Sequence, residues 1–384
     1  MIAKSLRGIA AAFLIGTAAV AAATLSTVGV AEAAGVRSAV GKPLQEAIEL
    51  AKAGKGSAAL AKVKEAEGVS GLTAAEQQAI GQTKEYVATK TGNFSGGVTN
   101  ATTAKAKFAA DYNAGRYHDV IATDADLLRK YGAFDGQSQL IVAQAYYLSR
   151  DYSGAMRYLN GLGDSDAVLS LKMAVAAKLG DGGVQGDVAE KLVLKGQVKF
   201  WPYLLSAADN THGLTDHQSL DIYRVRLLLG QMRSADDYSN ATQLAILLGL
   251  PQEAAAIQQK GFDAKVLSGQ RQQRLLDQAK TLAAQQVAQM PALVKQAQAA
   301  KTGDALVKLG EVYWASGHYD DAVTAIQSGI AKGVKDADDA QVRLGLAYMG
   351  QKKTSQALRA FNSVKADPKA KMDARLWSVY ARTH

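Results

Sequence analysis

Apolar residues recur along most of the chain at spacings of three and four, in blocks of about 12–16 residues. Leu140, Ala143 and Tyr147 form one such block, and Ala155 and Leu159 belong to the next. Short polar breaks that contain glycine separate the blocks, and no block alternates apolar and polar residues as a strand does. The pattern predicts an all-α chain built from antiparallel pairs of helices, an α-solenoid.

Two predicted helices begin with sequences that cap them. In Thr73–Glu76 and Thr215–Gln218, the threonine hydroxyl accepts an early backbone N–H while the Glu or Gln reaches back to the threonine backbone. The chain has only five prolines in 384 residues, so its helices meet few interruptions. The absence of cysteine excludes disulfides, thiolate metal sites and cysteine nucleophiles.

Three breaks are longer than a tight turn: Thr91–Thr103, Gly180–Asp187 and Asp209–Asp216. The first is the predicted boundary between an N-terminal helical piece and the remaining chain. We interpret the glycine-rich second break as a flexible connector, because it lacks the acidic spacing of a calcium loop. The predicted segments are a signal peptide (1–33), an N-terminal helical segment (34–91), irregular helical repeats (104–300) and a C-terminal repeat pair with a capping helix (301–384).

The strongest internal signal is a pattern that recurs after 35 residues: Leu-Gly-x-x-Tyr, then an alanine and a large apolar residue. It resembles the tetratricopeptide repeat, a helix–turn–helix of 34 residues. The resemblance is closest over Lys301–Pro368, and it departs from the family pattern at Leu306 and Gln341, where tryptophan is usual. The repeat length predicts about seven to ten helix pairs, several of them irregular. The residues expected to build the repeat are Leu309, Gly310, Tyr313, Ala322, Leu344, Gly345, Tyr348, Ala357 and Phe361.

Gly310 and Gly345 lie in the middle of predicted helices, where glycine costs about 1 kcal/mol relative to alanine. We expect the second helix of each pair to approach these glycines closely, with Ala322 and Ala357 opposite them. The close approach would offset the poor helix propensity of the two glycines.

Weaker repeat units precede the C-terminal pair. Gly115-Arg-Tyr117 lies 35 residues before Arg150-Asp-Tyr152, and both match Gly317-His-Tyr319 as the turn between two helices. Gly249-Leu-Pro251 is predicted to be another such turn.

Residues 1–33 have the pattern of a secretory signal. Lys4 and Arg7 precede an apolar stretch from Ile9 to Val20, and Ala31-Glu32-Ala33 is a small-x-small cleavage site. Cleavage and the absence of cysteine favour a bacterial periplasmic location, with no transmembrane span in the mature chain. The alternative is an inner-membrane anchor formed by an uncleaved N-terminal helix.

No sequence motif for phosphate, dinucleotide or zinc-protease chemistry occurs, and no serine-hydrolase motif does either. We therefore predict no catalytic residues, no metal ligands and no cofactor. One group of residues suggests a metal-dependent enzyme as an alternative, because imidazoles and carboxylates bind zinc or nickel. It comprises Asp209, His212, Asp216, His217 and Asp221, which we interpret instead as a polar loop leading into a helix.

The positive charge is concentrated at the C-terminus. The formal net charge of +9 becomes +8 when Lys4, Arg7 and Glu32 leave with the signal, and residues 343–384 carry +7. Such a face attracts anionic polysaccharide, anionic lipid or an acidic protein, although a merely solvated helix face is the alternative. We exclude nucleic acid because of the predicted compartment. The candidate binding patch is Lys352, Lys353, Arg359, Lys365, Lys369, Lys371 and Arg375.

Aromatic residues gather in Lys199–Tyr203, which is predicted to be either an exposed docking patch or, preferably, an irregular helix in the core. Trp377 and Tyr380 are predicted to form the apolar face of the last helix. That helix follows Pro368 and is expected to cap the stack.

The resemblance to tetratricopeptide proteins implies a non-catalytic scaffold that binds a protein or peptide on a concave face. With the predicted export signal, this favours an adaptor in cell-envelope assembly or export, whose partner is an unidentified envelope protein or peptide. The alternatives are binding of anionic polysaccharide or a membrane surface through the basic C-terminal face, and the metal-dependent enzyme at His212 and His217.

Overall fold

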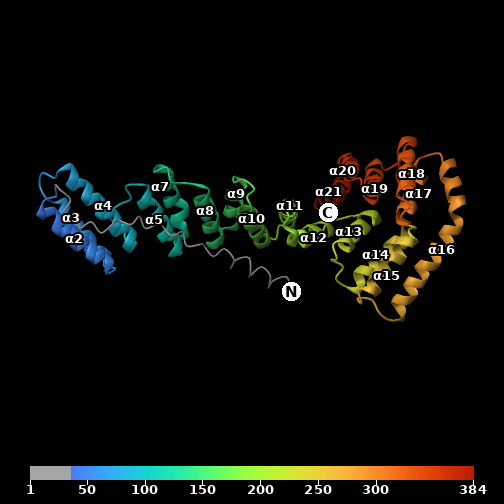
Figure 1. The fold of residues 1–384 in the computed structure, drawn as a ribbon, viewed down its shortest axis with the longest axis horizontal. Coiled ribbons are helices and arrows are strands. Elements are labelled where there is room, and N and C mark those ends of the chain that lie inside the picture. Colours follow the sequence, from blue (N-terminus) through green and yellow to red (C-terminus); the bar gives the residue numbers. More distant parts are fainter. Residues whose placement is uncertain (1–35) are drawn as a thin grey trace. The chain divides into compact units, whose positions relative to one another are not determined.

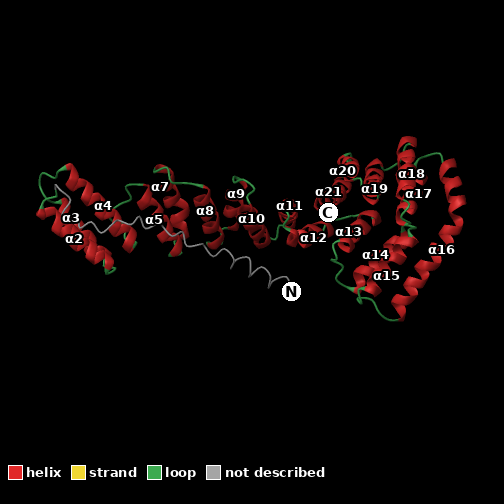
Figure 2. Cartoon of the chain, viewed as in Figure 1, coloured by secondary structure: helices red, strands yellow, loops and turns green. Residues whose placement is uncertain are grey.

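The computed structural model describes residues 36–384, and the predicted signal peptide (1–33) lies outside this range. Helices and turns make up the described chain, and no strand occurs within it (Figure 2). The prediction of an all-α architecture of paired helices is therefore confirmed. Among these residues, no helix combines the length and apolar character needed to cross a bilayer.

The described chain divides into two compact units between Gly180 and Asp181. This division lies inside the segment 104–300, for which the sequence predicts one continuous series of repeats. Each unit has apolar core clusters of its own.

The first unit consists of short helices that pack against their sequence neighbours (Figure 1). The predicted capping box at the start of α4 is present, because the Thr73 hydroxyl accepts the Glu76 N–H and the Glu76 carboxylate accepts the Thr73 N–H. Arg37 also pairs with the buried Glu76 carboxylate and so ties the start of α2 to α4. The helices are α2 (Ser38–Lys52), α3 (Gly56–Glu67), α4 (Ala74–Thr91), α5 (Ala101–Asn113), α6 (Tyr117–Asp119), a π-helical turn (Val120–Asp124), α7 (Ala125–Lys130), α8 (Gly136–Leu148), α9 (Tyr152–Asn160) and α10 (Asp166–Leu179).

The second unit contains the predicted repeat pair, which forms α17 with α18 and α19 with α20 (Figure 1). The predicted capping box of Thr215 and Gln218 begins α13. The helices are α11 (Gly182–Leu194), a 3-10 turn (Val198–Phe200), α12 (Trp201–Asp209), α13 (Asp216–Leu228), α14 (Ala235–Leu247), α15 (Pro251–Asp263), α16 (Gln270–Ala299), α17 (Asp304–Ala315), α18 (Tyr319–Lys332), α19 (Ala337–Gly350), α20 (Thr354–Asn362) and α21 (Pro368–Thr383).

The two helices of each repeat approach closely at glycine. A Cβ added to Gly310 on α17 would overlap Ile326 Cγ1 and lie 3.0 Å from the Ala322 carbonyl oxygen of α18. A Cβ added to Gly345 on α19 would overlap the ring of Phe361, which is buried on α20. The remaining repeat residues are buried or half-buried on the same helices: Leu309, Tyr313, Leu344, Tyr348 and Ala357.

A left-handed residue turns the chain between the helices of several pairs. The φ angle is +75° at Gly115, +66° at Arg150, +79° at Gly317 and +60° at Lys352. The predicted equivalence of the turns at 115, 150 and 317 is therefore confirmed. Glycine adopts this conformation freely, whereas a residue with a Cβ does so at about 1–2 kcal/mol.

One helix is longer than the usual block of 12–16 residues, and one prediction about a connector is wrong. The helix α16 has 30 residues, because its alanine- and glutamine-rich sequence contains no glycine break and Pro291 does not end it. The glycine-rich break at 180–187 is largely helical rather than a flexible connector. There, α11 begins at Gly182, since the Asp181 carboxylate accepts the Val184 N–H and caps the helix.

The last helix closes the second unit. It packs against α19 and α20 and also contacts α11, α12 and α13 (Figure 1). Trp377 of α21 is buried, and the ring centroid of Tyr380 lies 6.4 Å from that of Trp201 on α12. The expectation that α21 caps the stack is therefore corrected, because helices cover it on more than one side. Burial of Phe200 and Trp201 confirms that Lys199–Tyr203 contributes to the core.

Candidate functional site

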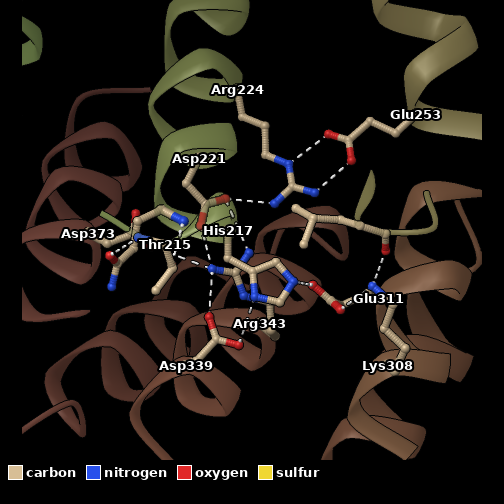
Figure 3. Close-up of polar contacts among 12 residues, drawn as sticks. Thr215, His217, Asp221, Arg224, Glu253, Lys308, Glu311, Asp339, Arg343 and Asp373 are labelled. Carbon is tan, nitrogen blue, oxygen red and sulfur yellow. Dashed lines mark hydrogen bonds and ion pairs between the residues drawn. The ribbon is translucent and has the colours of Figure 1, made fainter. Parts of the chain in front are cut away.

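Charged side chains from five helices of the second unit meet in its interior (Figure 3). They come from α13, α15, α17, α19 and α21, so every second helix along this stretch contributes. We call this set the ionic network, and its members are His217, Asp221, Arg224, Glu253, Lys308, Glu311, Asp339, Arg343 and Asp373.

Arg224 joins α13 to α15. Its Nε and Nη2 lie 2.7 and 2.6 Å from the two carboxylate oxygens of Glu253, and its Nη1 lies 2.7 Å from Asp221 Oδ1. The guanidinium also lies over the Trp314 ring, 4.6 Å from its centroid. This two-point pairing fixes the orientation of the guanidinium and satisfies its donors, as a buried arginine requires.

Arg343 joins α19 to α13 and α21. Its Nη1 lies 3.3 Å from Asp221 Oδ1, and its Nη2 contacts Asp221 Oδ2. The same Nη2 lies 3.2 Å from Asp339 Oδ1 and 3.5 Å from Asp373 Oδ2. Burial favours the neutral form of Asp221, but the charges of Arg343 and Arg224 outweigh it and lower its pKa. Burial and the charge of Asp221 raise the pKa of Asp373 well above its usual range.

His217 joins α13 to α17 and α19. Its Nε2 lies 3.1 Å from Glu311 Oε1, and its Nδ1 lies 3.4 Å from Asp339 Oδ2. Burial disfavours the charged imidazole, but the contacts with the Asp339 and Glu311 carboxylates outweigh it and raise the pKa of His217 to about 9. Burial likewise opposes ionisation of Glu311, yet His217 lowers its pKa to about 2. Lys308 pairs with Glu311 at 3.2 Å and donates to the Leu248 carbonyl.

The ionic network is neutral if one carboxyl group holds a proton. Its cationic groups are His217, Arg224, Lys308 and Arg343, and its carboxyl groups are Asp221, Glu253, Glu311, Asp339 and Asp373. An uncompensated buried charge is strongly unfavourable. Because Asp373 is the network carboxyl group whose pKa burial and Asp221 raise, we infer that it is the group that holds this proton.

The space beside the network is too small for a substrate. A cavity of about 10 Å³ lies against Arg224, Glu311 and Arg343, which is close to the minimum that holds one water molecule. The geometry therefore indicates that the network holds alternate helices together across the interior of the unit.

The predicted histidine and aspartate group does not come together. His212 and Asp216 are exposed, and Asp209 pairs with Arg226. His217 and Asp221 enter the ionic network, where guanidinium groups occupy the coordination space and repel a cation. Within residues 36–384, no cluster of three or more His, Cys, Asp or Glu is arranged to hold a metal ion.

The basic C-terminal segment divides into three groups. Arg343 is buried in the network. Lys369 donates to the Gly213 carbonyl, and Arg375 pairs with Asp187 at 3.0 Å and with Glu190. The remaining patch residues are exposed and make no ion pair with a described residue: Lys352, Lys353, Arg359, Lys365 and Lys371.

Sequence reasoning missed Arg224, Glu253, Lys308, Glu311 and Asp339. Spacings such as Asp339 and Arg343 at i,i+4 are typical of exposed helix pairs and give no warning of burial. A usable signal exists at Arg343, which lies between Val342 and Leu344 in a largely apolar helix.

Comparison with known proteins agrees with the repeat geometry. Residues 339–370, from α19 into α21, match the family model described as tetratricopeptide repeat. A search of curated proteins finds no match to the chain. A chain in the crystal structure of the APC/C hetero-tetramer Cut9–Hcn1 is 13% identical, over 87% of this chain and 68% of that one, with a TM-score of 0.22. The family match and the glycine contact between α19 and α20 show that residues 339–370 form a tetratricopeptide repeat.

Proposed function

We propose that the protein is a non-catalytic scaffold that binds another protein or a peptide in cell-envelope assembly or export. The observation that carries this proposal is the tetratricopeptide repeat at 339–370, set among paired helices. Stacked helix pairs offer extended surfaces suited to partner proteins. The ionic network fills the inner side of the second unit, so we expect the partner on outward-facing helix surfaces.

In-cell photocrosslinking tests the scaffold role. The exposed apolar side chains of Leu247 on α14 and Val287 on α16 are 69% and 61% exposed, and they suit replacement by a photoreactive amino acid. We expect a discrete crosslinked species, identified by mass spectrometry, from one or more such positions. Absence of any crosslinked protein after a scan of exposed positions on both units would contradict the scaffold proposal.

We also propose a periplasmic location, which the charged, apolar and small-residue pattern of residues 1–33 supports. Cell fractionation with N-terminal sequencing is the test. A periplasmic product that begins at Ala34 supports export with cleavage. A membrane-bound product that begins at Met1 replaces this proposal with the anchored alternative.

A second candidate function is binding of anionic polysaccharide through the patch. Lys352, Lys353 and Arg359 favour it, because these cations are exposed and lack ion-pair partners among the described residues. Their joint replacement by glutamine should abolish salt-dependent retention on an anionic polysaccharide column. Truncation at residue 343 is unsuitable, since it removes α21 and the buried Arg343. Unchanged retention of the triple variant excludes the patch as the polymer site.

A further inference from the structure

Closure of the second unit by α21 leaves a cavity of about 270 Å³ between α11, α20 and α21. Its apolar wall includes Leu194, Phe361, Val364 and Val379. Its polar side is formed largely by α21. A second cavity of about 250 Å³ lies between α11, α12 and α21 and shares Glu190, Lys371 and Arg375 with the first. The first cavity is large enough for a small organic molecule.

One stripe of α21 supplies the polar side of the first cavity. Lys371, Arg375, Ser378 and Arg382 follow one another at i, i+4, i+7 and i+11, so they share one helix face. Like charges four residues apart on one helix face, such as Lys371 and Arg375, destabilise the helix. The stripe therefore places three cations beside one cavity, although their mutual repulsion lowers the stability of the helix itself.

The protein supplies only part of the countercharge. Glu190 of α11 is the one carboxylate that lines the first cavity, and it pairs with Arg375. Burial raises the pKa of Glu190 even though Arg375 opposes the change. Lys371 and Arg382 make no ion pair with any described residue. The lining of the first cavity thus carries three cations against one carboxylate, and Asp187 in the second cavity gives Arg375 another partner.

We propose that this cavity binds a small organic anion, with its phosphate or carboxylate group beside the cationic stripe of α21 and its apolar part against Leu194 and Phe361. The cavity differs from the exposed cations Lys353 and Arg359, because its lining includes apolar side chains. Glu190 competes with the ligand for Arg375, so the site is weakened by its own carboxylate. The proposal is independent of the scaffold function.

Calorimetric titration of the purified protein with four probes tests the site. Phenyl phosphate and benzoate combine an anion with an apolar ring, whereas inorganic phosphate and benzyl alcohol each lack one feature. We expect one of the two ring-bearing anions to bind with 1:1 stoichiometry and a Kd of about a few millimolar or tighter. The stronger of the two identifies the ligand as a phosphate or a carboxylate. Binding by neither overturns the proposal.

Matched variants locate the binding. Lys371→Gln combined with Arg382→Gln should weaken binding by at least about tenfold, because charge-assisted hydrogen bonds are lost. Lys353→Gln combined with Arg359→Gln removes the same charge outside the cavity and should leave the Kd within twofold. Glu190→Gln should tighten binding. Equal weakening by the two charge-matched double variants overturns the proposal, and tryptophan fluorescence confirms that each variant is folded.

Discussion

The protonation of Asp373 predicts that two neighbouring aspartates respond very differently to the same substitution. Asp373→Asn replaces a neutral carboxyl group with a neutral amide of nearly equal size. Asp221→Asn removes the anion that lies between Arg224 and Arg343. The first variant keeps the ionic network neutral, and the second leaves one buried positive charge uncompensated.

The structure sets the magnitudes. Asp221 is completely buried and contacts both guanidinium groups, so its loss should destabilise the second unit by about 3–5 kcal/mol. Asp373→Asn should leave the free energy of unfolding nearly unchanged at pH 4 and should raise it at pH 7, by up to about 1.4 kcal/mol per pH unit above 4, because the folded wild type must take up a proton that asparagine does not need. If Asp373 were ionised, its replacement would instead remove a counter-ion from Arg343 and be strongly destabilising.

The assay is denaturant unfolding followed by tryptophan fluorescence. All three tryptophans, Trp201, Trp314 and Trp377, belong to the second unit, so the signal reports on that unit alone. The pH dependence gives a second measurement. The folded-state pKa of Asp373 is raised, so its stabilisation is complete below about pH 4 and is lost as pH rises through the folded pKa. Asp373→Asn should abolish that part of the slope.

Equal destabilisation by Asp373→Asn and Asp221→Asn at pH 7 would refute the reasoning. So would a pH profile that Asp373→Asn leaves unchanged between pH 4 and 8. Either result would mean that both aspartates are ionised and that the network carries a net negative charge.

Three further predictions follow from single residues. Gly345→Ala should destabilise the protein by about 1–3 kcal/mol, because the added Cβ overlaps buried Phe361. Gly81→Ala on α4 should stabilise it by up to about 1 kcal/mol, because no atom lies within 4 Å of the added Cβ. Thermal melts by circular dichroism measure both variants, and stabilisation by Gly345→Ala would contradict the close approach of the helices. Lys352→Gly should raise stability by about 0.5–1 kcal/mol in the same melts, since it relieves a left-handed φ of +60°; a loss of stability would argue against strain. His217 has a folded-state pKa of about 9, above its unfolded value, so its stabilisation of up to about 3 kcal/mol is present below about pH 6.5 and is lost as pH rises through 9. His217→Gln should flatten this part of the stability–pH profile measured by tryptophan fluorescence. An unaltered slope would exclude His217 as its source.

Features that depend on neighbours in sequence were predictable. The Thr73 and Thr215 capping boxes, the turn at Arg150 and the mid-helix glycine at Gly345 each follow from local chemistry or from the repeat. In a helix pair the contacting residues are less than one repeat apart, so periodicity contains the information needed to pair them.

The closure of the second unit was not predictable in this way. Asp221 and Arg343 are 122 residues apart, and nothing in the spacing of either residue marks the other as its partner. The sequence places Trp377 on the apolar face of a terminal helix. Burial of Asp373 on the same helix shows that other helices cover more than this one face of α21. For the same reason, a count of C-terminal cations overstates the exposed charge, because Arg343 is interior.

Closure changes how function can be mapped on this protein. In an open solenoid each repeat contacts only its neighbours, so terminal repeats can be removed while the remainder stays folded. Here α21 contacts α11, α12 and α13, and Arg343 of α19 neutralises Asp221 of α13. Deleting the last helices would expose Trp201 and leave Asp221 and Arg224 with an altered charge balance. A truncation that abolishes partner binding would therefore report unfolding of the second unit, and only substitutions at exposed positions separate binding from folding.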